Sequence, residues 1–401
     1  QYSLLGFNTE KYNHSYNNFF LKTNNRLEFK NLNRIRAYLL GSVGIIFSDF
    51  IVFQNDYEFD SNGAEDFHWD GTLRETSGKW TGYLTHSSVT IDYLNGHLLL
   101  GRGNTFLQGF SNSLLLNKNI PPRFNIWWNL YKNNLTFDWG IIFLDKVDNY
   151  LYNRLFTFHR YSIKAETFHI GFTEALLTRY YDFSEVTKYL LPSSSLFEVE
   201  VNNSGGNLFW MVDGFYKFNR YYFFLEILVD DFSLDMQSPH KIAYKFGIRS
   251  DFSNLKLILE YVNVDRWVGN YFYPSLRLVE NNLRIGHEIG PDAHQISCKA
   301  NVYIAEKLIC NLEFSLIEKG GGSIFESWPV NSENFNFGYN FEDFPSGDKY
   351  LISFINIYFR YNMNNYFYLD GGLTVSGMDS GKIYNNKLIN DQVSITIGIN
   401  Y

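Results

Sequence analysis

The sequence predicts an all-β transmembrane barrel, and three observations lead to that prediction. First, the 401-residue chain is 45% hydrophobic and 19% aromatic, which is far too much apolar surface for a disordered chain. Second, no window approaches the ~18–20 uninterrupted apolar residues that a membrane-spanning helix needs. Third, apolar and polar residues alternate through long segments, which gives a strand one apolar face and one polar face.

The alternation is the main signal. It is clearest in residues 393–401 (VSITIGINY), 296–304 (ISCKANVYI), 308–316 (LICNLEFSL), 242–249 (IAYKFGIR) and 135–143 (LTFDWGIIF). Such segments run ~9–13 residues, longer than the ~5–6 usual in soluble proteins and long enough to cross a bilayer at a tilt. A large soluble β-sandwich or β-helix would also alternate, but no repeat of constant length supports a β-helix.

We count eighteen alternating segments and two classes of connection. The segments start near residues 17, 34, 50, 84, 96, 123, 134, 155, 167, 206, 220, 240, 254, 292, 307, 348, 365 and 390. Connections after even-numbered segments are short, such as 94–95, whereas those after odd-numbered segments are mostly long, such as 318–347. The connection near Leu32 is a short exception. Outer-membrane barrels have short periplasmic turns and long extracellular loops, so we expect one barrel domain, residues 1–401, with both termini in the periplasm.

Composition also bounds the location and the partners. The net charge of −8 gives no basic footprint, so we expect no nucleic-acid partner. The chain begins with Gln1 and shows no apolar signal region, which we interpret as a mature chain whose export signal has been removed. We therefore expect the protein to lie in the outer membrane of a Gram-negative bacterium. Its expected partners are outer-membrane lipid, a surface polysaccharide and other outer-membrane proteins.

Charges on the polar faces are predicted to point into the barrel. A charge that faces lipid at the midplane costs ~2–4 kcal/mol, so the lumen is the more favourable location. Neighbouring strands carry opposite signs, as where Glu226 faces the strand of Lys245, and this favours a narrow or closed lumen. These charges either brace the lumen or line a path for a small solute. The predicted lumen charges are Glu226, Lys245, Arg249, Lys256, Glu260, Lys299, Glu313, Arg360 and Asp370.

Motifs for catalysis and for metal or cofactor binding are weak. Gly101-Arg102-Gly103 lacks the third glycine and the helix of a dinucleotide fingerprint. His287-Glu288 with His294 lacks the spacing of a zinc protease, and no Ser/His/Asp grouping stands out. We therefore expect no enzyme activity, no metal and no cofactor.

The two cysteines are predicted to stay unbonded. A tight turn at 305–307 places Cys310 opposite roughly Val302, so Cys298 lies ~13 Å further along the strand. A disulfide needs Cα atoms within ~7 Å. We expect two free thiols that face lipid.

The predicted outer loops are rich in aromatic and polar residues. Sugars bind by stacking their CH faces on aromatic rings and by forming hydrogen bonds between their hydroxyl groups and polar side chains. The alternative is that the rings only pack the loops into a lid. The candidate carbohydrate-binding residues are Trp69, Trp80, Tyr180, Tyr181, Trp267, Tyr271 and Trp328.

A series of short pieces resembles the Wzi family of capsule-assembly proteins. The pieces occur in the family's order, although its Trp-Gly-Pro-Gly stretch is replaced here by residues 107–110 (LQGF). The pieces are Gly101-Arg102, Leu114-Leu115-Leu116, Pro121-Pro122, His159-Arg160, Phe172-Thr173-Glu174-Ala175, Leu225-Glu226-Ile227-Leu228-Val229-Asp230-Asp231-Phe232, Glu260-Tyr261 and Ile285-Gly286-His287-Glu288-Ile289-Gly290-Pro291-Asp292-Ala293.

The resemblance implies an eighteen-stranded outer-membrane barrel that acts as a non-enzymatic surface lectin and helps hold exported capsular polysaccharide on the cell. Five of the shared residues lie near the outer rim on the predicted topology, and we expect them to form one polar cluster that shapes loop closure: His159, Arg160, Glu174, Asp230 and Asp231. A channel for small solutes and a structural subunit of a larger outer-membrane complex are the alternatives.

Overall fold

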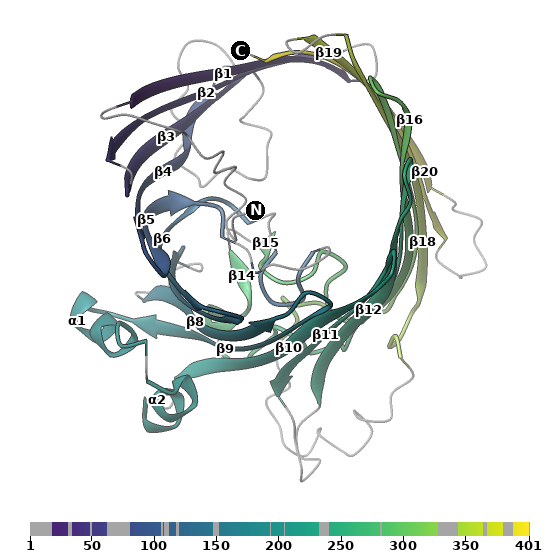
Figure 1. Ribbon diagram of the computed structural model, residues 1–401. Coiled ribbons are helices and arrows are strands. Elements are labelled where there is room, and N and C mark those ends of the chain that lie inside the picture. The colour runs from purple at the N-terminus through teal and green to yellow at the C-terminus, as the bar shows by residue number, and fades with distance from the viewer. Residues whose placement is uncertain are drawn as a thin grey trace.

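The computed structural model is a closed barrel of eighteen antiparallel strands (Figure 1). It describes residues 18–30, 34–48, 50–61, 81–105, 107, 112–117, 120–146, 152–192, 194–203, 205–231, 240–280, 283–327, 344–363, 367–379 and 388–400. Strands that follow one another along the chain pair with each other, and the first barrel strand also pairs with the last, which closes the sheet.

The eighteen barrel strands lie close to their predicted positions. They are β1 (Asn18–Lys30), β2 (Arg34–Ser48), β3 (Ile51–Asp60), β4 (Thr81–Tyr93), β5 (Gly96–Gly103), β6 (Arg123–Lys132), β7 (Leu135–Leu144), β8 (Asn153–Lys164), β9 (Phe168–Tyr180), β10 (Gly206–Phe218), β11 (Tyr221–Asp231), β12 (Lys241–Asp251), β13 (Leu255–Val264), β16 (Ala293–Ala305), β17 (Leu308–Lys319), β18 (Tyr350–Asn362), β19 (Phe367–Asp379) and β20 (Leu388–Asn400). The largest error is at β4, which begins at Thr81 rather than near residue 84.

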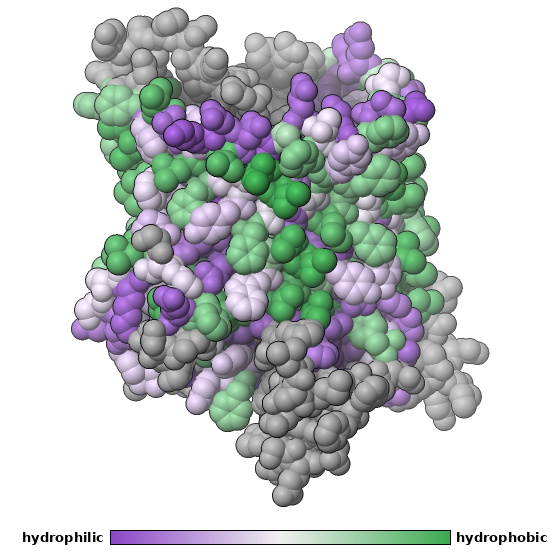
Figure 2. Space-filling model, turned by 60° about the horizontal axis from the view of Figure 1, so that its bottom comes forward, coloured by the Kyte–Doolittle hydropathy of each residue, from purple (hydrophilic) through white to green (hydrophobic). Residues whose placement is uncertain are grey.

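Alternation sets the two faces of the wall, as predicted. On β10, Trp210 and Val212 point outward and are 40% and 45% exposed, whereas Phe209 and Met211 point into the barrel and are almost completely buried. In Figure 2, apolar side chains cover the middle of the visible wall, and hydrophilic side chains form a row along its upper edge. The fold class predicted from the period-two pattern is confirmed.

Turn and loop lengths follow the predicted asymmetry. The turns at one end are tight, and Asn133 and Asn219 adopt φ of 53° and 55° there, a left-handed conformation that asparagine tolerates. The long connections all leave from the opposite end, which we take as the extracellular end.

The described residues of two long connections fold into the barrel. We call residues 104–122 the first lumen loop and residues 265–292 the second lumen loop; the second contains η3 (Pro274–Leu276) and the short hairpin β14 (Val279–Glu280) and β15 (Leu283–Arg284). Figure 1 shows β14 and β15 inside the ring of strands. Apolar side chains of the two lumen loops and of the inner wall form one buried cluster.

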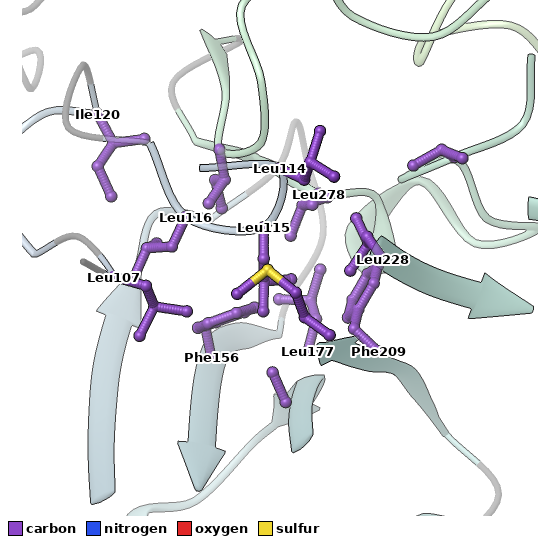
Figure 3. Close-up of a cluster of buried hydrophobic side chains, with 14 of the residues drawn as sticks. Leu107, Leu114, Leu115, Leu116, Ile120, Phe156, Leu177, Phe209, Leu228 and Leu278 are labelled. Carbon is purple, nitrogen blue, oxygen red and sulfur yellow. The ribbon is translucent and has the colours of Figure 1, made fainter. Parts of the chain in front are cut away.

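Leu115 of the first lumen loop lies at the centre of this cluster (Figure 3). Phe156, Leu177 and Phe209 of the inner wall surround it, and all of these side chains are fully buried. Burying a leucine stabilises a fold by roughly 1.5–3 kcal/mol, so this apolar run holds the loop inside the barrel.

A third long connection folds onto the outside of the wall. We call residues 181–205 the outer flap; it contains α1 (Phe183–Val186), η2 (Thr187–Tyr189) and α2 (Leu196–Asn203). Figure 1 shows α1 and α2 outside the barrel beside β8, β9 and β10. Val186, Tyr189 and Leu196 pack on the outward side chains Leu155 and Leu176 of the wall.

The prediction that the two cysteines stay unbonded is also confirmed. Cys310 pairs with Val302 and Cys298 pairs with Phe314 in the β16–β17 ladder, and both thiols are free. Among the described helices, none is long and apolar enough to cross a membrane.

Candidate functional site: a tyrosine–arginine platform at the outer rim

An exposed group of aromatic rings surrounds Arg179 at the extracellular end of β9. The Arg179 Cζ atom lies 4.8 Å from the ring centroid of Tyr152 and 4.5 Å from that of Tyr273. Tyr181 continues the group on one side, with its ring centroid 4.1 Å from that of Tyr152. Phe272 continues it on the other side, with its centroid 4.9 Å from that of Tyr273. We call these five residues the rim platform.

The rim platform is open to solvent. Tyr181, Phe272 and Tyr273 are 58%, 48% and 44% exposed, and Arg179 is half-buried between the rings. Three parts of the chain supply it: the residue before β8, the end of β9 and the second lumen loop. Such an arrangement presents aromatic faces and guanidinium donors side by side.

Arg154 fixes the second lumen loop beneath the rim platform. Its guanidinium is fully buried and donates to the backbone carbonyls of Ser275 (2.8 Å), Arg277 (2.9 Å) and Val279 (2.7 Å). Its remaining nitrogen donates to the Asp145 carboxylate at 2.9 Å. A buried charge with all of these partners holds residues 275–279, and therefore the adjoining Tyr273, in one position on β8.

Glu280 extends this anchor. Its carboxyl group accepts a hydrogen bond from the backbone N–H of Asp145 at 3.0 Å and contacts the guanidinium of Arg123. Burial and the neighbouring Asp145 carboxylate raise the pKa of Glu280 to about 8, and Arg123 opposes this shift.

The predicted carbohydrate-binding residues fall in different places. Tyr181 belongs to the rim platform, and Tyr271 lies next to it, with its ring centroid 6.5 Å from that of Tyr273. Tyr180 instead faces outward and packs against the cluster under the outer flap, and Trp267 is 3% exposed, which is too buried for a sugar to reach. The predicted residues Trp69, Trp80 and Trp328 lie outside the described residues.

The sequence analysis did not select Tyr152, Arg179 or Phe272. Tyr152 belongs to a different loop from Phe272 and Tyr273, and only the fold of the second lumen loop brings them together. The available signal was the position of Arg179 at the extracellular end of an alternating strand, where an inward side chain meets the folded loops.

The predicted single polar cluster at the rim is wrong. His159 and Arg160 are neighbours on β8, and alternation sends them to opposite faces of the wall. His159 faces outward with Glu174, its partner in the β8–β9 ladder, under the outer flap.

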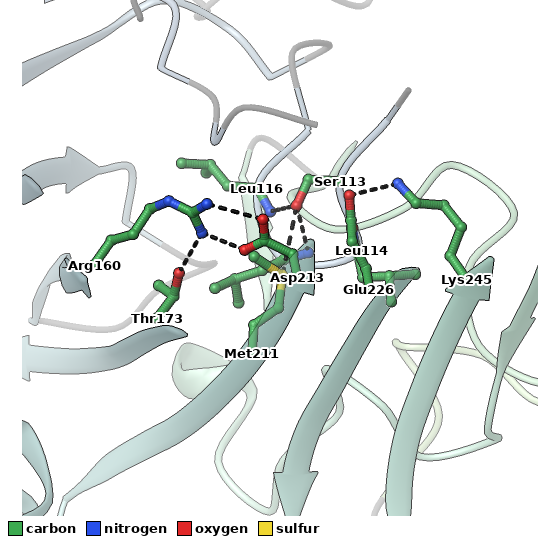
Figure 4. Close-up of polar contacts among 10 residues, drawn as sticks. Ser113, Leu114, Leu116, Arg160, Thr173, Met211, Asp213, Glu226 and Lys245 are labelled. Atoms are coloured by element: carbon green, nitrogen blue, oxygen red, sulfur yellow. Dashed lines mark hydrogen bonds and ion pairs between the residues drawn. The ribbon is translucent and has the colours of Figure 1, made fainter. Parts of the chain in front are cut away.

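Arg160 and Asp230, two other members of that predicted cluster, lie inside the barrel, apart from His159 and Glu174. Arg160 donates to Thr173 and forms a buried ion pair with Asp213 (Figure 4). Asp230 accepts from the backbone N–H of Gly269 in the second lumen loop at 2.7 Å. Asp231 ends β11, where it pairs with Lys241.

The predicted lumen charges lie on the inner wall, and most of them form ion pairs. Lys245 Nζ lies 2.7 Å from Glu226, Lys299 Nζ lies 2.8 Å from Glu313, and Arg360 Nε lies 2.7 Å from Asp370. Arg249 pairs with Asp251, Lys256 lies near the Tyr303 ring, and Glu260 is buried on the inner face of β13.

The Glu226–Lys245 pair also fastens the first lumen loop. Glu226 accepts from the backbone N–H of Leu114 at 3.0 Å, and Lys245 donates to the carbonyl of Asn112 at 2.7 Å. Ser113 accepts from the backbone N–H of Leu115 at 3.2 Å, and Figure 4 shows Ser113 and Leu114 beside the Glu226–Lys245 pair. This ion pair therefore positions the first lumen loop.

A small cavity remains between the two lumen loops and the inner wall. It measures about 20 Å³, room for about one water molecule, and His287 and Arg284 are among its lining residues. Burial, with Lys245 and Lys299 nearby, lowers the pKa of His287 to about 3, so this imidazole is neutral at physiological pH. No group of three or more metal-ligating side chains occurs in the described part of the chain.

Comparisons with known proteins place the fold. No protein-family model matches the chain, and no curated protein matches its sequence. Wzi of Escherichia coli, an outer-membrane protein involved in group 1 capsule assembly and a carbohydrate-binding β-barrel, superposes with a TM-score of 0.62 and 10% identity over 95% of this chain and 84% of that chain.

Two barrels of Pseudomonas aeruginosa are also similar in structure. OccK1 (OpdK) has a TM-score of 0.56 and 8% identity over 96% of this chain and 98% of that chain. OccD3 (OpdP) has a TM-score of 0.54 and 9% identity over 96% of this chain and 91% of that chain. At such identities the likeness concerns the fold alone, and the chain has the fold of outer-membrane β-barrels.

Proposed function

We propose that this chain is an outer-membrane barrel that binds an exported polysaccharide at its extracellular rim and helps to attach it to the cell surface, without catalysing a reaction. The single observation that carries this proposal is the rim platform, an exposed set of aromatic rings at the end of the barrel with the long loops. The carbohydrate-binding barrel among the structural neighbours supports the same role.

Tyr181 and Tyr273 provide the stacking faces in this proposal. A pyranose ring buries its CH face against a tyrosine, while its hydroxyl groups bind water and nearby polar groups. Because Arg154 holds the loop that carries Tyr273, little ordering is left for the moment of binding, and this preorganisation increases affinity.

A solute channel is the second candidate. It is favoured by the side chains of Lys299, Glu313 and Arg360, which are partly exposed on the inner wall of β16 to β18; Arg360 pairs with the buried Asp370 of β19. One Pseudomonas aeruginosa barrel of the same fold was solved with vanillate. The two lumen loops count against a wide channel, because they and the wall bury a common apolar cluster inside the barrel.

Glycan binding by the purified protein in detergent tests the first candidate. We expect binding to at least one exported bacterial polysaccharide and a loss of about tenfold or more in affinity for the Tyr181→Ala, Tyr273→Ala double variant, since each ring is a stacking surface. Tyr216→Ala removes a tyrosine of similar exposure on the outward wall and should leave binding unchanged.

The same preparation separates the two candidates. Clear single-channel conductance in planar bilayers, together with no binding to any surface polysaccharide, would support the channel and exclude the lectin-like role. Binding that survives the double tyrosine substitution would remove the rim platform from the proposal.

A further inference from the structure

Arg179 has no counter-ion among the residues that the structure describes. Several other arginines in the described ranges pair with a carboxylate, among them Arg154, Arg160, Arg249, Arg266 and Arg360. The guanidinium of Arg179, in contrast, forms no ion pair and no hydrogen bond with any described residue; its contacts are the Tyr152 and Tyr273 rings. The donors of this half-buried guanidinium are therefore open to water or to an anionic ligand, and a carboxylate accepts them more strongly than water does.

The N–H donors of Arg179 have no acceptor among the described residues, and its contacts are with the two rings. A guanidinium carries five N–H donors in its plane, and stacking on aromatic rings uses its faces rather than these donors. Planar carboxylates bind such an edge through two parallel hydrogen bonds. The tyrosines therefore fix the orientation of the donor group, as a binding site for a carboxylate requires.

No carboxylate of the described residues pairs with Arg179. Its ladder partner Arg154 is also a cation, and the neighbouring Asp145 carboxylate pairs with Arg154. Asp182 follows closely in the chain, but its carboxylate accepts from the backbone N–H of Ser184 at the start of α1. The positive charge stays at the surface next to the exposed rings of Tyr181 and Tyr273.

We infer that the rim platform selects an acidic polysaccharide, with Arg179 binding the carboxylate of a uronic acid while a flanking tyrosine stacks on the ring of the same or the next sugar. This inference rests on the proposed function and adds the substrate class. Arg179 is a binding residue here, and it acts by direct contact with the ligand.

Polygalacturonate and its methyl ester form a matched pair of probes, because they share one backbone and differ in the carboxylate charge. We expect wild-type protein to bind polygalacturonate about tenfold or more tightly than the methyl ester, and added salt should reduce this difference. Arg179→Gln should make the two affinities equal, and Arg179→Lys should keep part of the preference as a point charge without the planar fork.

Arg220→Gln is the matched control. Its guanidinium also stacks on two rings, Tyr221 and Phe252, but at the turn end of the barrel, so the preference for polygalacturonate should be unchanged. Circular dichroism of each variant checks that the barrel has folded, and Arg179→Lys provides the test if Arg179→Gln does not fold.

The outcomes for substrate class and for polysaccharide binding are distinguishable. Equal affinity of wild-type protein for the two polymers, with binding abolished by Tyr273→Ala, would overturn the acidic selectivity and leave polysaccharide binding in place. Failure of the wild type to bind polygalacturonate while it binds a neutral polysaccharide would overturn the inference in the same way. Failure to bind every polysaccharide would overturn both.

Discussion

The first lumen loop and the outer flap are fastened to opposite sides of one wall by the same chemistry. Inside, Glu226 on β11 accepts from the backbone N–H of Leu114 at 3.0 Å. Outside, Glu174 on β9 accepts from the backbone N–H groups of Leu196 and Phe197, both at 3.1 Å. In both cases a strand carboxylate binds loop amides, and buried leucines complete the contact.

The difference lies in the second partner of each carboxylate. Glu226 also pairs with the buried Lys245, so the lumen contact is ionic and almost completely desolvated. The side chain of Glu174 keeps 14% of its exposure, and its nearest basic group is His159 at 4.0 Å. Alternation along the strands assigns each carboxylate to one face of the wall. We expect the desolvated ion pair on the inner face to hold its loop more strongly than the partly exposed Glu174 holds the outer flap.

The largest expected effect follows from breaking the inner contact. Glu226→Ala leaves Lys245 buried without a counter-ion and should weaken the first lumen loop by about 3–5 kcal/mol. Hydrogen exchange at the amides of residues 112–117 measures this loss. The double variant Glu226→Ala, Lys245→Met should recover part of it, and a loss below about 1 kcal/mol in the single variant would contradict the account.

Acid should release the second lumen loop through His287. Its folded pKa of about 3 lies below the ordinary 6.5 because of burial and the nearby Lys245 and Lys299. The free energy by which neutral His287 stabilises the folded protein is therefore fully present above pH 6.5 and is lost as the pH falls toward 3. We expect a loss of about 2 kcal/mol between pH 6.5 and 5.

His287→Gln isolates this contribution. Burial raises the pKa of Asp265 in the same loop to about 6, so Asp265 works in the opposite direction in wild-type and variant protein alike. Hydrogen exchange of residues 283–290 should respond to acid less in the variant than in the wild type. An identical response in the two proteins would show that His287 does not titrate as described.

The smallest effect is expected at the outer contact. Glu174→Ala removes the acceptor for two amides at the start of α2 and should weaken the outer flap by about 1–2 kcal/mol, as the loss of a helix cap does. Exchange should increase at Leu196 and Phe197 and stay unchanged at residues 112–117. Coupled changes at both places would mean that the inner and outer contacts are not independent.

Sequence predicted the barrel better than it predicted the site. Strand positions, wall faces and the ladder position of Cys310 follow from a local period of two, which the chain shows directly. Where a long loop folds depends on contacts far away in the chain, as when Arg154 binds residues 275–279. For this reason the sequence wrongly indicated that sugars reach Trp267, which is buried, and it gave no indication of Arg179.

One error was avoidable from the same pattern. Alternation places the adjacent residues His159 and Arg160 on opposite faces, so they could not share one polar cluster. Their separation follows from the rule that correctly assigned the lumen charges Glu226 and Lys245 to the inside.

We propose that polysaccharide binds at the rim platform rather than in the lumen. Hydrogen exchange of the backbone amides, measured with and without polysaccharide, distinguishes these two locations. With a bound polysaccharide, we expect slower exchange of the amides at residues 179–181 and 271–273 and no change in the wall strands β16 to β19. Protection confined to β16 to β19, with the rim residues unaffected, would contradict it.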